Sequence, residues 1–157
     1  MILSKLDAVL RAADDQRQAD LDDLFTLIRQ PSISAQNIGV RECAMLVRDF
    51  MQDAGLETRL IETSGHPMVV GSWEHASEER PTILFYGHYD VQPPEPLELW
   101  TSEPFEPEIR DGRIYARGVA DNKAQFFSHL RAIRHWMRET GELPVNVKFL
   151  AEGEEEV

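Results

Sequence analysis

The chain is short of cysteine, of basic residues and of long apolar runs. Its single cysteine, Cys43, excludes an intramolecular disulfide, and a chain without disulfides is expected in the cytoplasm. No run of about 18 or more apolar residues is present, so the sequence predicts no membrane-spanning helix and no membrane partner. Residues 1–7 contain an early acid and lack a continuous apolar segment, so they do not resemble a secretory signal.

Basic residues are outnumbered: 16 Lys and Arg residues stand against 28 Asp and Glu residues, giving a formal net charge of -12. A nucleic-acid-binding protein needs a basic stripe to offset phosphate repulsion, and this chain has none. We therefore exclude nucleic acid as a partner. Most of the acidic residues are expected on a solvated surface, although part of this acidity is available to bind cations.

The apolar spacing predicts three helical regions. The first spans residues 6–28, with a break near Asp14–Asp15 and an end before Pro31. The second runs from about Val40 to Ala54 and ends at Gly55. The third and strongest runs from Asn122 to Arg138, before Gly141.

Strand-like segments alternate with these helices. They cover Glu57–Glu62, Met68–Trp73, Thr82–Tyr86 and Val145–Leu150, and the Asp111-Gly112 pair predicts a hairpin turn between two further short strands. Strands that alternate with helices predict an α/β fold in which a mixed, mostly parallel sheet is flanked by helices.

The first candidate site follows the apolar segment 82–86. Gly87 ends this strand, and His88 and Asp90 come directly after it, at the carboxyl end where open α/β sheets place ligands. His88 offers a neutral imidazole nitrogen to a metal, and Asp90 is placed to support the other ring nitrogen. A histidine hydrogen-bonded within a loop is the alternative interpretation of this pair.

The second candidate is Asp121, just before the strongest helix. A carboxylate there is often a helix N-cap, and this is the simpler interpretation. The two oxygens of one carboxylate are also suited to bridging two cations about 3.5–4 Å apart. Gly118, three residues earlier, permits a close backbone approach.

The third candidate is the acidic run from Glu152 to Glu156, which follows the buried segment 145–150. An acidic run usually forms a solvated loop. Here it follows an apolar strand, so some of these carboxylates are expected at the carboxyl edge of the sheet. Two adjacent carboxylates can divide the work, one binding metal while the other stays free as a base.

Three blocks in this order resemble peptidase family M20, the co-catalytic zinc aminoacylases, carboxypeptidases, dipeptidases and deacetylases. The blocks are residues 87–93 (GHYDVQP), 118–123 (GVADNK) and 152–157 (EGEEEV). Residues 121–123 and the long connection from Pro93 to Phe105 most resemble the carnosinase-like, cytosolic dipeptidase branch. The zinc-exopeptidase-like sandwich is the fold that the resemblance implies.

The resemblance also implies two zinc ions, with cobalt or manganese as alternatives, and a role for each site residue. His88 and Glu156 would each bind one metal, and Asp121 would bridge both. Glu155 would be the general base of amide-bond hydrolysis, and Asp90 would support His88 and influence the base. A cis peptide bond is implied at Asp121–Asn122.

Residues 1–157 would then form the N-terminal part of the catalytic domain. His88, Asp121 and Glu156 are too few to saturate two four-coordinate zinc ions, so we expect a truncated, inactive portion. The lid or dimerisation domain and the C-terminal catalytic part would be absent. A dipeptide or small N-acyl amino acid is the implied substrate, and the full-length enzyme is expected to be a homodimer.

Three alternatives compete with this interpretation. A catalytically silent metal-binding domain of the same fold would differ from the hydrolase in lacking a complete set of metal ligands. An N-acyl amino acid deacylase of the same family would differ from the dipeptidase only in its substrate. A serine or cysteine hydrolase is disfavoured, because the chain has no Gly-x-Ser-x-Gly motif. Cys43 also lies on the apolar stripe of its helix, as a core residue does.

Overall fold

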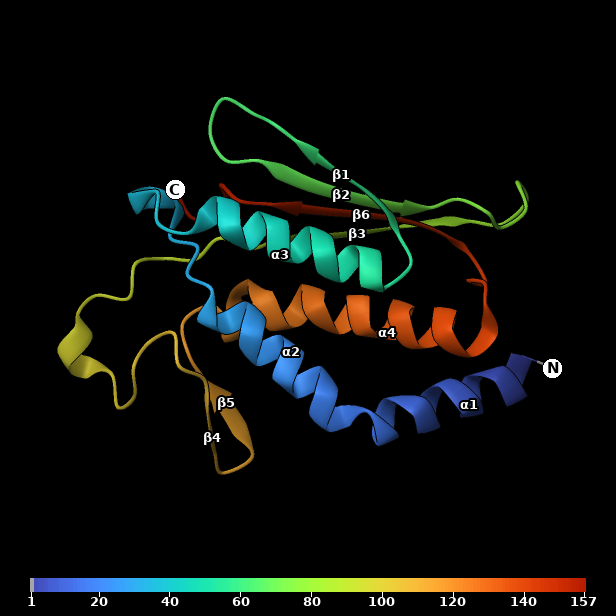
Figure 1. The fold of residues 1–157 in the computed structure, drawn as a ribbon, viewed down its shortest axis with the longest axis horizontal. Helices are drawn as coiled ribbons and strands as arrows, with labels where there is room; N and C mark the ends of the chain where they lie inside the picture. Colours follow the sequence, from blue (N-terminus) through green and yellow to red (C-terminus); the bar gives the residue numbers. More distant parts are fainter. Residues whose placement is uncertain (1) are drawn as a thin grey trace.

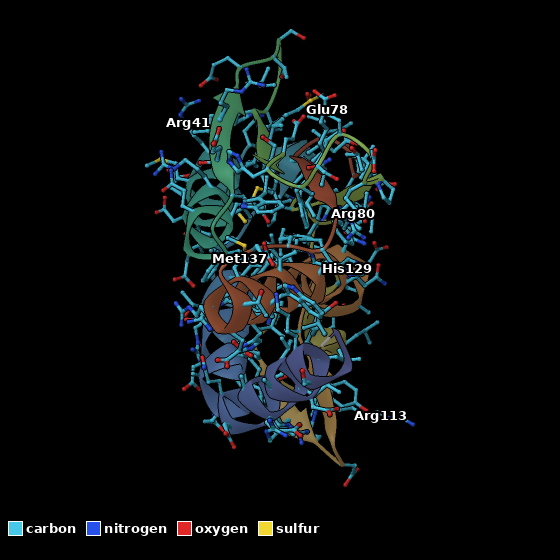
Figure 2. The ribbon with its side chains drawn as sticks, turned by 90° about the vertical axis from the view of Figure 1, so that its right-hand side faces the viewer. Arg41, Glu78, Arg80, Arg113, His129 and Met137 are labelled. Atoms are coloured by element: carbon cyan, nitrogen blue, oxygen red, sulfur yellow. The ribbon has the colours of Figure 1, made fainter. Side chains whose placement is uncertain are left out.

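The computed structural model describes residues 2–157, which fold into a sheet and two layers of helices (Figure 1). The sheet lies along one side of the molecule, α3 and α4 lie beneath it, and α1 and α2 lie beneath α4. The turned view in Figure 2 shows the same succession of layers. Within the described residues, none of the helices is both long enough and apolar enough to cross a membrane.

The helices and strands follow the predicted segments closely. The helices are α1 (Ile2–Asp15), α2 (Arg17–Arg29), α3 (Val40–Asp53) and α4 (Ala124–Thr140), with short helical segments η1 (Ser34–Gln36), η2 (Leu97–Leu99) and η3 (Val119–Lys123). The strands are β1 (Glu57–Ile61), β2 (Met68–Trp73), β3 (Thr82–His88), β4 (Glu108–Arg110), β5 (Arg113–Tyr115) and β6 (Asn146–Glu152). The break in the first helical region falls at Gln16, as the sequence predicted near Asp14–Asp15.

The main sheet has the strand order β1-β2-β6-β3. The prediction of a mixed sheet is confirmed, but the prediction that it is mostly parallel is wrong. The β1–β2 and β2–β6 pairs are antiparallel, and parallel pairing is limited to β3 and β6. The physical reason is the short connection between β1 and β2, since a parallel pair needs a crossover of a dozen or more residues. The chain makes such a crossover through α4, between β3 and β6.

Two features of the sheet were not predicted from the sequence. The four described α-helices lie on one face of the sheet only (Figure 1). The strand order was also not predicted: β6 lies between β2 and β3, so the edge strands of the described sheet are β1 and β3. On the face without helices, Leu84 and Tyr86 of β3 are exposed.

The core lies between the sheet and the pair α3 and α4. The completely buried side chains there include Val47 and Met51 of α3, Val69 of β2 and Phe149 of β6, and Phe126 of α4 is nearly so. Burial of a side chain of this size contributes about 1.5–3 kcal/mol, so this interface is the main source of stability. Cys43 is also completely buried in this core, which confirms its predicted structural role, and burial raises the pKa of its thiol.

The turns show the expected backbone conformations. Asp111 and Gly112 both adopt positive φ angles, 51° and 73°, as the β4–β5 hairpin requires. Gly141 ends α4 with a φ of 74°.

An ion network ties α4 to α2 and α3. Arg134 donates from Nε to Asp53 Oδ2 at 2.5 Å, and its Nη1 lies 3.5 Å from Asp20 Oδ1. His135 Nε2 lies 2.6 Å from Asp20 Oδ2, and Arg131 Nη1 lies 3.8 Å from Asp20 Oδ1. Arg131, Arg134 and His135 are all buried, so their positions depend on these carboxylates.

We predict that Asp20→Ala lowers the free energy of unfolding by about 3 kcal/mol, because it leaves buried Arg134 and His135 without their shared carboxylate. The value is at the low end of the range for broken buried pairs because the Asp20 side chain is 17% exposed. Urea denaturation measures the change. Asp22→Ala on the same helix is the control and should change the stability by no more than about 0.5 kcal/mol, since Asp22 is exposed. Equal losses in both variants would contradict this account.

Candidate metal centre

The site is built on His88, the last residue of β3. His88 is 5% exposed, and its two ring nitrogens face different partners. Nδ1 lies 3.2 Å from the backbone oxygen of Asp90 and 3.4 Å from its Oδ1 atom. Nε2 lies 3.0 Å from Asp121 Oδ1 and 3.9 Å from Glu155 Oε2. The three carboxylates predicted beside His88 therefore surround it in the folded chain.

Asp90 is completely buried and holds the segment that follows β6. Its Oδ2 accepts a hydrogen bond from the backbone amide of Glu156 at 2.8 Å, and its Oδ1 accepts one from the amide of Glu155 at 3.3 Å. Burial raises the pKa of the Asp90 carboxyl, but the hydrogen bonds from His88 and from these amides outweigh it and lower the pKa overall. Asp90 is therefore held as an anion that orients both His88 and the acidic segment.

Asp121 lies in η3, in an extended conformation with φ -138° and ψ 95°. Its side chain is 74% exposed, and the peptide bond to Asn122 is cis, as predicted. The simpler interpretation of Asp121 as the N-cap of the following helix is wrong, because the N-cap residue of α4 is Lys123 and no side chain caps that end. The carboxylate instead faces His88.

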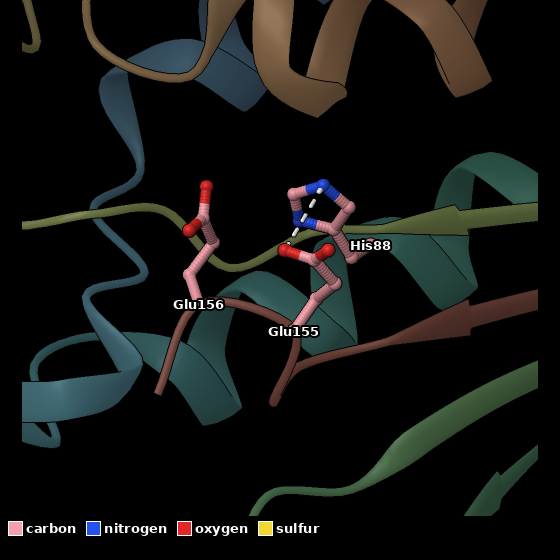
Figure 3. A group of neighbouring side chains, drawn as sticks. All are labelled: His88, Glu155 and Glu156. Carbon is pink, nitrogen blue, oxygen red and sulfur yellow. Dashed lines mark ion pairs between the residues drawn. The ribbon is translucent and has the colours of Figure 1, made fainter.

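Glu155 and Glu156 project toward His88 from the segment after β6 (Figure 3). One ligand atom from each of these three residues lies within 4.8 Å of the other two. Glu156 Oε2 also accepts a hydrogen bond from Gln92 Nε2 at 2.6 Å. The parallel register explains the encounter: His88 of β3 pairs with Glu152 of β6, so residues just beyond both strand ends meet at one edge.

The electrostatics of His88 reflect this ring of carboxylates. Burial lowers the pKa of His88, but hydrogen bonds to Asp90 and Asp121 outweigh that effect and raise the pKa to about 9. A positive charge is therefore stabilised where Nε2 faces Asp121. A bound metal ion would place its own charge at the same position.

The donor set fits a zinc ion. One imidazole nitrogen and carboxylate oxygens from separate elements converge, and both are common zinc ligands. The Nδ1 atom of His88 faces the backbone oxygen of Asp90, so Nε2 is the nitrogen that faces the Asp121 carboxylate. No ligand atom is contributed by Cys43, which is buried in the core.

Sequence reasoning assigned no role to Lys123, although it lies within one of the motif blocks. Its side chain is completely buried, and its Nζ donates to the backbone oxygens of Gln30 at 2.7 Å and Leu27 at 3.1 Å. These carbonyls lie at the C-terminal end of α2, where helix carbonyls lack partners within the helix. No sequence signal distinguishes this buried lysine from a solvated one, because its neighbours Asn122 and Gln125 are also polar.

Comparison with known proteins adds the family. Residues 84–157 match the model of peptidase family M20/M25/M40. This region belongs to that family. The matched region contains the whole of the site described above, from His88 to Glu156.

The chain is similar to several proteins of known function. It is 35% identical over 130 residues to a succinyl-diaminopimelate desuccinylase of Thiobacillus denitrificans, covering 83% of this chain and 32% of that protein. Its structure matches the M20 family metallo-carboxypeptidase Sso-CP2 of Sulfolobus solfataricus with 39% identity and a TM-score of 0.80, over 87% of this chain and 31% of the other. Human carnosine dipeptidase 1 matches with 25% identity and a TM-score of 0.86, over 96% and 35% of the two chains. This chain thus spans about a third of the length of its M20 relatives.

We predict that Asp90→Ala releases the acidic segment of this M20 site. The variant removes the charged acceptor of the Glu155 and Glu156 amides, and such a hydrogen bond contributes about 1.5–3 kcal/mol. Hydrogen exchange at these two amides should accelerate by about tenfold or more. The amide of Leu130, which is buried in α4, is the internal comparison. Its exchange rate should change only as far as the global free energy of unfolding changes. Unchanged exchange at Glu155 and Glu156 would show that Asp90 does not hold them.

Proposed function

We propose that this chain carries part of the active site of a metal-dependent hydrolase that cleaves amide bonds in dipeptides or small N-acyl amino acids. The observation that carries the proposal is the convergence of Asp121 and Glu155 on the Nε2 atom of a buried histidine, at the carboxyl end of the parallel strand pair. Membership of the matched region in the M20 family supports it.

In this proposal His88 and Glu156 each hold one zinc ion and Asp121 is shared between the two. When bound, zinc lowers the pKa of a water molecule toward neutrality and polarises the substrate carbonyl. Cobalt or manganese suits the same nitrogen and oxygen donors. Two four-coordinate ions need more ligands than these three residues, so we expect incomplete metal sites in this chain alone.

Glu155 is the proposed general base. Its carboxylate is exposed at the site and has no side-chain partner stronger than the 3.9 Å approach to His88 among the contacts of the described residues. It would accept the proton of the attacking water and return it to the departing amine. Asp90 supports this role by fixing the Glu155 backbone and the His88 ring at the same time.

A small substrate agrees with the surroundings of the site. A groove of about 680 Å³ runs beside η3, lined by Trp100, Ile114, Tyr115, Val119 and Ala120 among others. Ala120, in the lining of this groove, directly precedes Asp121 in the chain. The relatives are named for a carboxypeptidase, a dipeptidase and a desuccinylase, and the proposed substrate classes cover the dipeptide and N-acyl cases.

The resemblance extends the proposal to the whole protein, which we propose is a homodimer that acts on small molecules and binds no nucleic acid. A catalytically silent metal-binding domain remains the second candidate, because the described site holds few ligands. Turnover of an amide substrate separates the two, since the silent domain would bind metal without hydrolysis.

We predict that zinc binding, measured by titration calorimetry, weakens by at least about tenfold in Asp121→Ala. The reason is the loss of the carboxylate that lies 3.0 Å from His88 Nε2. Glu74→Ala removes an exposed carboxylate paired with Lys148 on the sheet and should leave the affinity unchanged. Equal affinities for the native chain and Asp121→Ala would exclude Asp121 from the metal site.

We predict that Glu155→Gln keeps its metal affinity but loses amide hydrolysis by about 10²–10⁴-fold, because the amide cannot accept the proton. The measurement is turnover of a panel of dipeptides and N-acetyl and N-succinyl amino acids by the full-length protein in the presence of zinc, since this chain alone is expected to be inactive. A variant with full turnover would refute the base assignment. A variant that loses zinc instead would show that Glu155 is a ligand, and would exchange the proposed roles of Glu155 and Glu156.

A further inference from the structure

The backbone amide of His88 has an unusual partner. In an edge strand, successive N–H groups point alternately toward the neighbouring strand and away from it. The Tyr89 amide donates to Glu152 of β6 at 2.8 Å, so the preceding His88 amide points away from the sheet. Its hydrogen bond is accepted by Asn122 Oδ1 at 3.2 Å, from η3 rather than from a strand.

The other end of the Asn122 side chain continues the connection. Asn122 Nδ2 donates to Gln125 Oε1 at 2.5 Å, and Gln125 Nε2 donates to the backbone oxygen of Ala120 at 2.6 Å. The hydrogen-bonded chain thus runs from the end of β3 through two amide side chains to the residue before Asp121. Asp121 is held on both sides, by Ala120 and by Asn122.

The close approach of η3 to β3 depends on Gly87. A Cβ atom at this position would lie 2.7 Å from Asn122 Oδ1 and 2.7 Å from Phe126 Cβ, well inside normal contact distances. The absence of a side chain at Gly87 therefore lets the Asn122 amide reach the backbone of the strand.

We propose that Asn122 is a positioning residue that sets the Asp121 carboxylate against the His88 imidazole, and thereby sets the geometry of the metal site. This inference rests on the proposed metal-dependent function of the site. A neutral amide suits the task, because it both accepts from His88 and donates to Gln125 without adding charge beside Asp121 and Glu155.

Asn122 is not the residue that attaches η3 to the fold. Lys123 does this through its two hydrogen bonds to the end of α2, and it is completely buried. The Asn122 residue is only partly buried, and among the described residues its side chain forms hydrogen bonds with His88 and Gln125. Replacing Asn122 should therefore disturb the site more than the fold.

The test compares Asn122→Leu, which keeps the size and removes the hydrogen bonds, with Asn122→Asp, which keeps the acceptor for the His88 amide. Ile133→Val, in the buried part of α4, is the control for a general loss of stability. Two readouts are used on the 157-residue chain: hydrogen exchange at the His88 amide without metal, and titration with Co²⁺ followed by its visible absorption spectrum.

We expect Asn122→Leu to accelerate exchange at His88 by about tenfold, to weaken Co²⁺ binding by about tenfold and to change the shape of the absorption bands. Asn122→Asp retains the acceptor and should keep exchange at the His88 amide within about threefold of the native chain, and Ile133→Val should keep the native spectrum. The proposal is overturned if Asn122→Leu behaves like the native chain, if Ile133→Val causes the same loss, or if the native chain binds no Co²⁺. If the variants of this chain respond as expected but the full-length protein hydrolyses no amide, the result would support this inference and refute only the proposed function.

Discussion

The parallel pairing of β3 with β6 is the constraint on which the site depends. It is the only parallel pair in the described sheet, and it aligns His88 with Glu152 at one edge. The residues just beyond the two strands, Asp90 on one side and Glu155 and Glu156 on the other, must therefore meet. A shift of one residue in this register would turn the His88 side chain to the opposite face and separate it from the carboxylates.

The same edge concentrates negative charge, which costs free energy unless cations or hydrogen-bond donors offset it. Asp90, at the bottom of the site, is offset by two backbone amides and the His88 ring. Asp121 and Glu155, nearer the surface, have fewer partners and are more exposed. The structure thus separates a buried carboxylate that organises the site from exposed carboxylates that are free to bind a cation or a proton.

Much of this could be predicted from the sequence because local signals were strong. Apolar periodicity located α3 and α4, the Asp111-Gly112 turn located the β4–β5 hairpin, and three motif blocks gave the family resemblance. Strand order was not predictable in the same way, because β2 and β6 lie far apart in the chain and their pairing is decided by packing over the whole core. For that reason the sheet was expected to be mostly parallel, whereas the β1–β2 and β2–β6 pairs are antiparallel.

The contacts around the site were also only partly predictable. The sequence indicated that His88, Asp90, Asp121, Glu155 and Glu156 belong together, and the structure brings them together. It did not indicate the anchoring role of Lys123, since a buried lysine and a solvated one look the same in a polar helix start. Nor did it indicate the amide chain through Asn122 and Gln125, which depends on the close approach of η3 to the glycine that precedes His88.

The most direct test of the metal centre is a crystal structure of the chain grown with Zn²⁺, with anomalous diffraction recorded at the zinc edge. The account predicts an anomalous peak about 2.0–2.2 Å from His88 Nε2 and from an Asp121 carboxylate oxygen, with Glu155 or Glu156 facing it. A zinc peak elsewhere, with His88 Nε2 still hydrogen-bonded directly to Asp121, would contradict the assignment of these residues as a metal site.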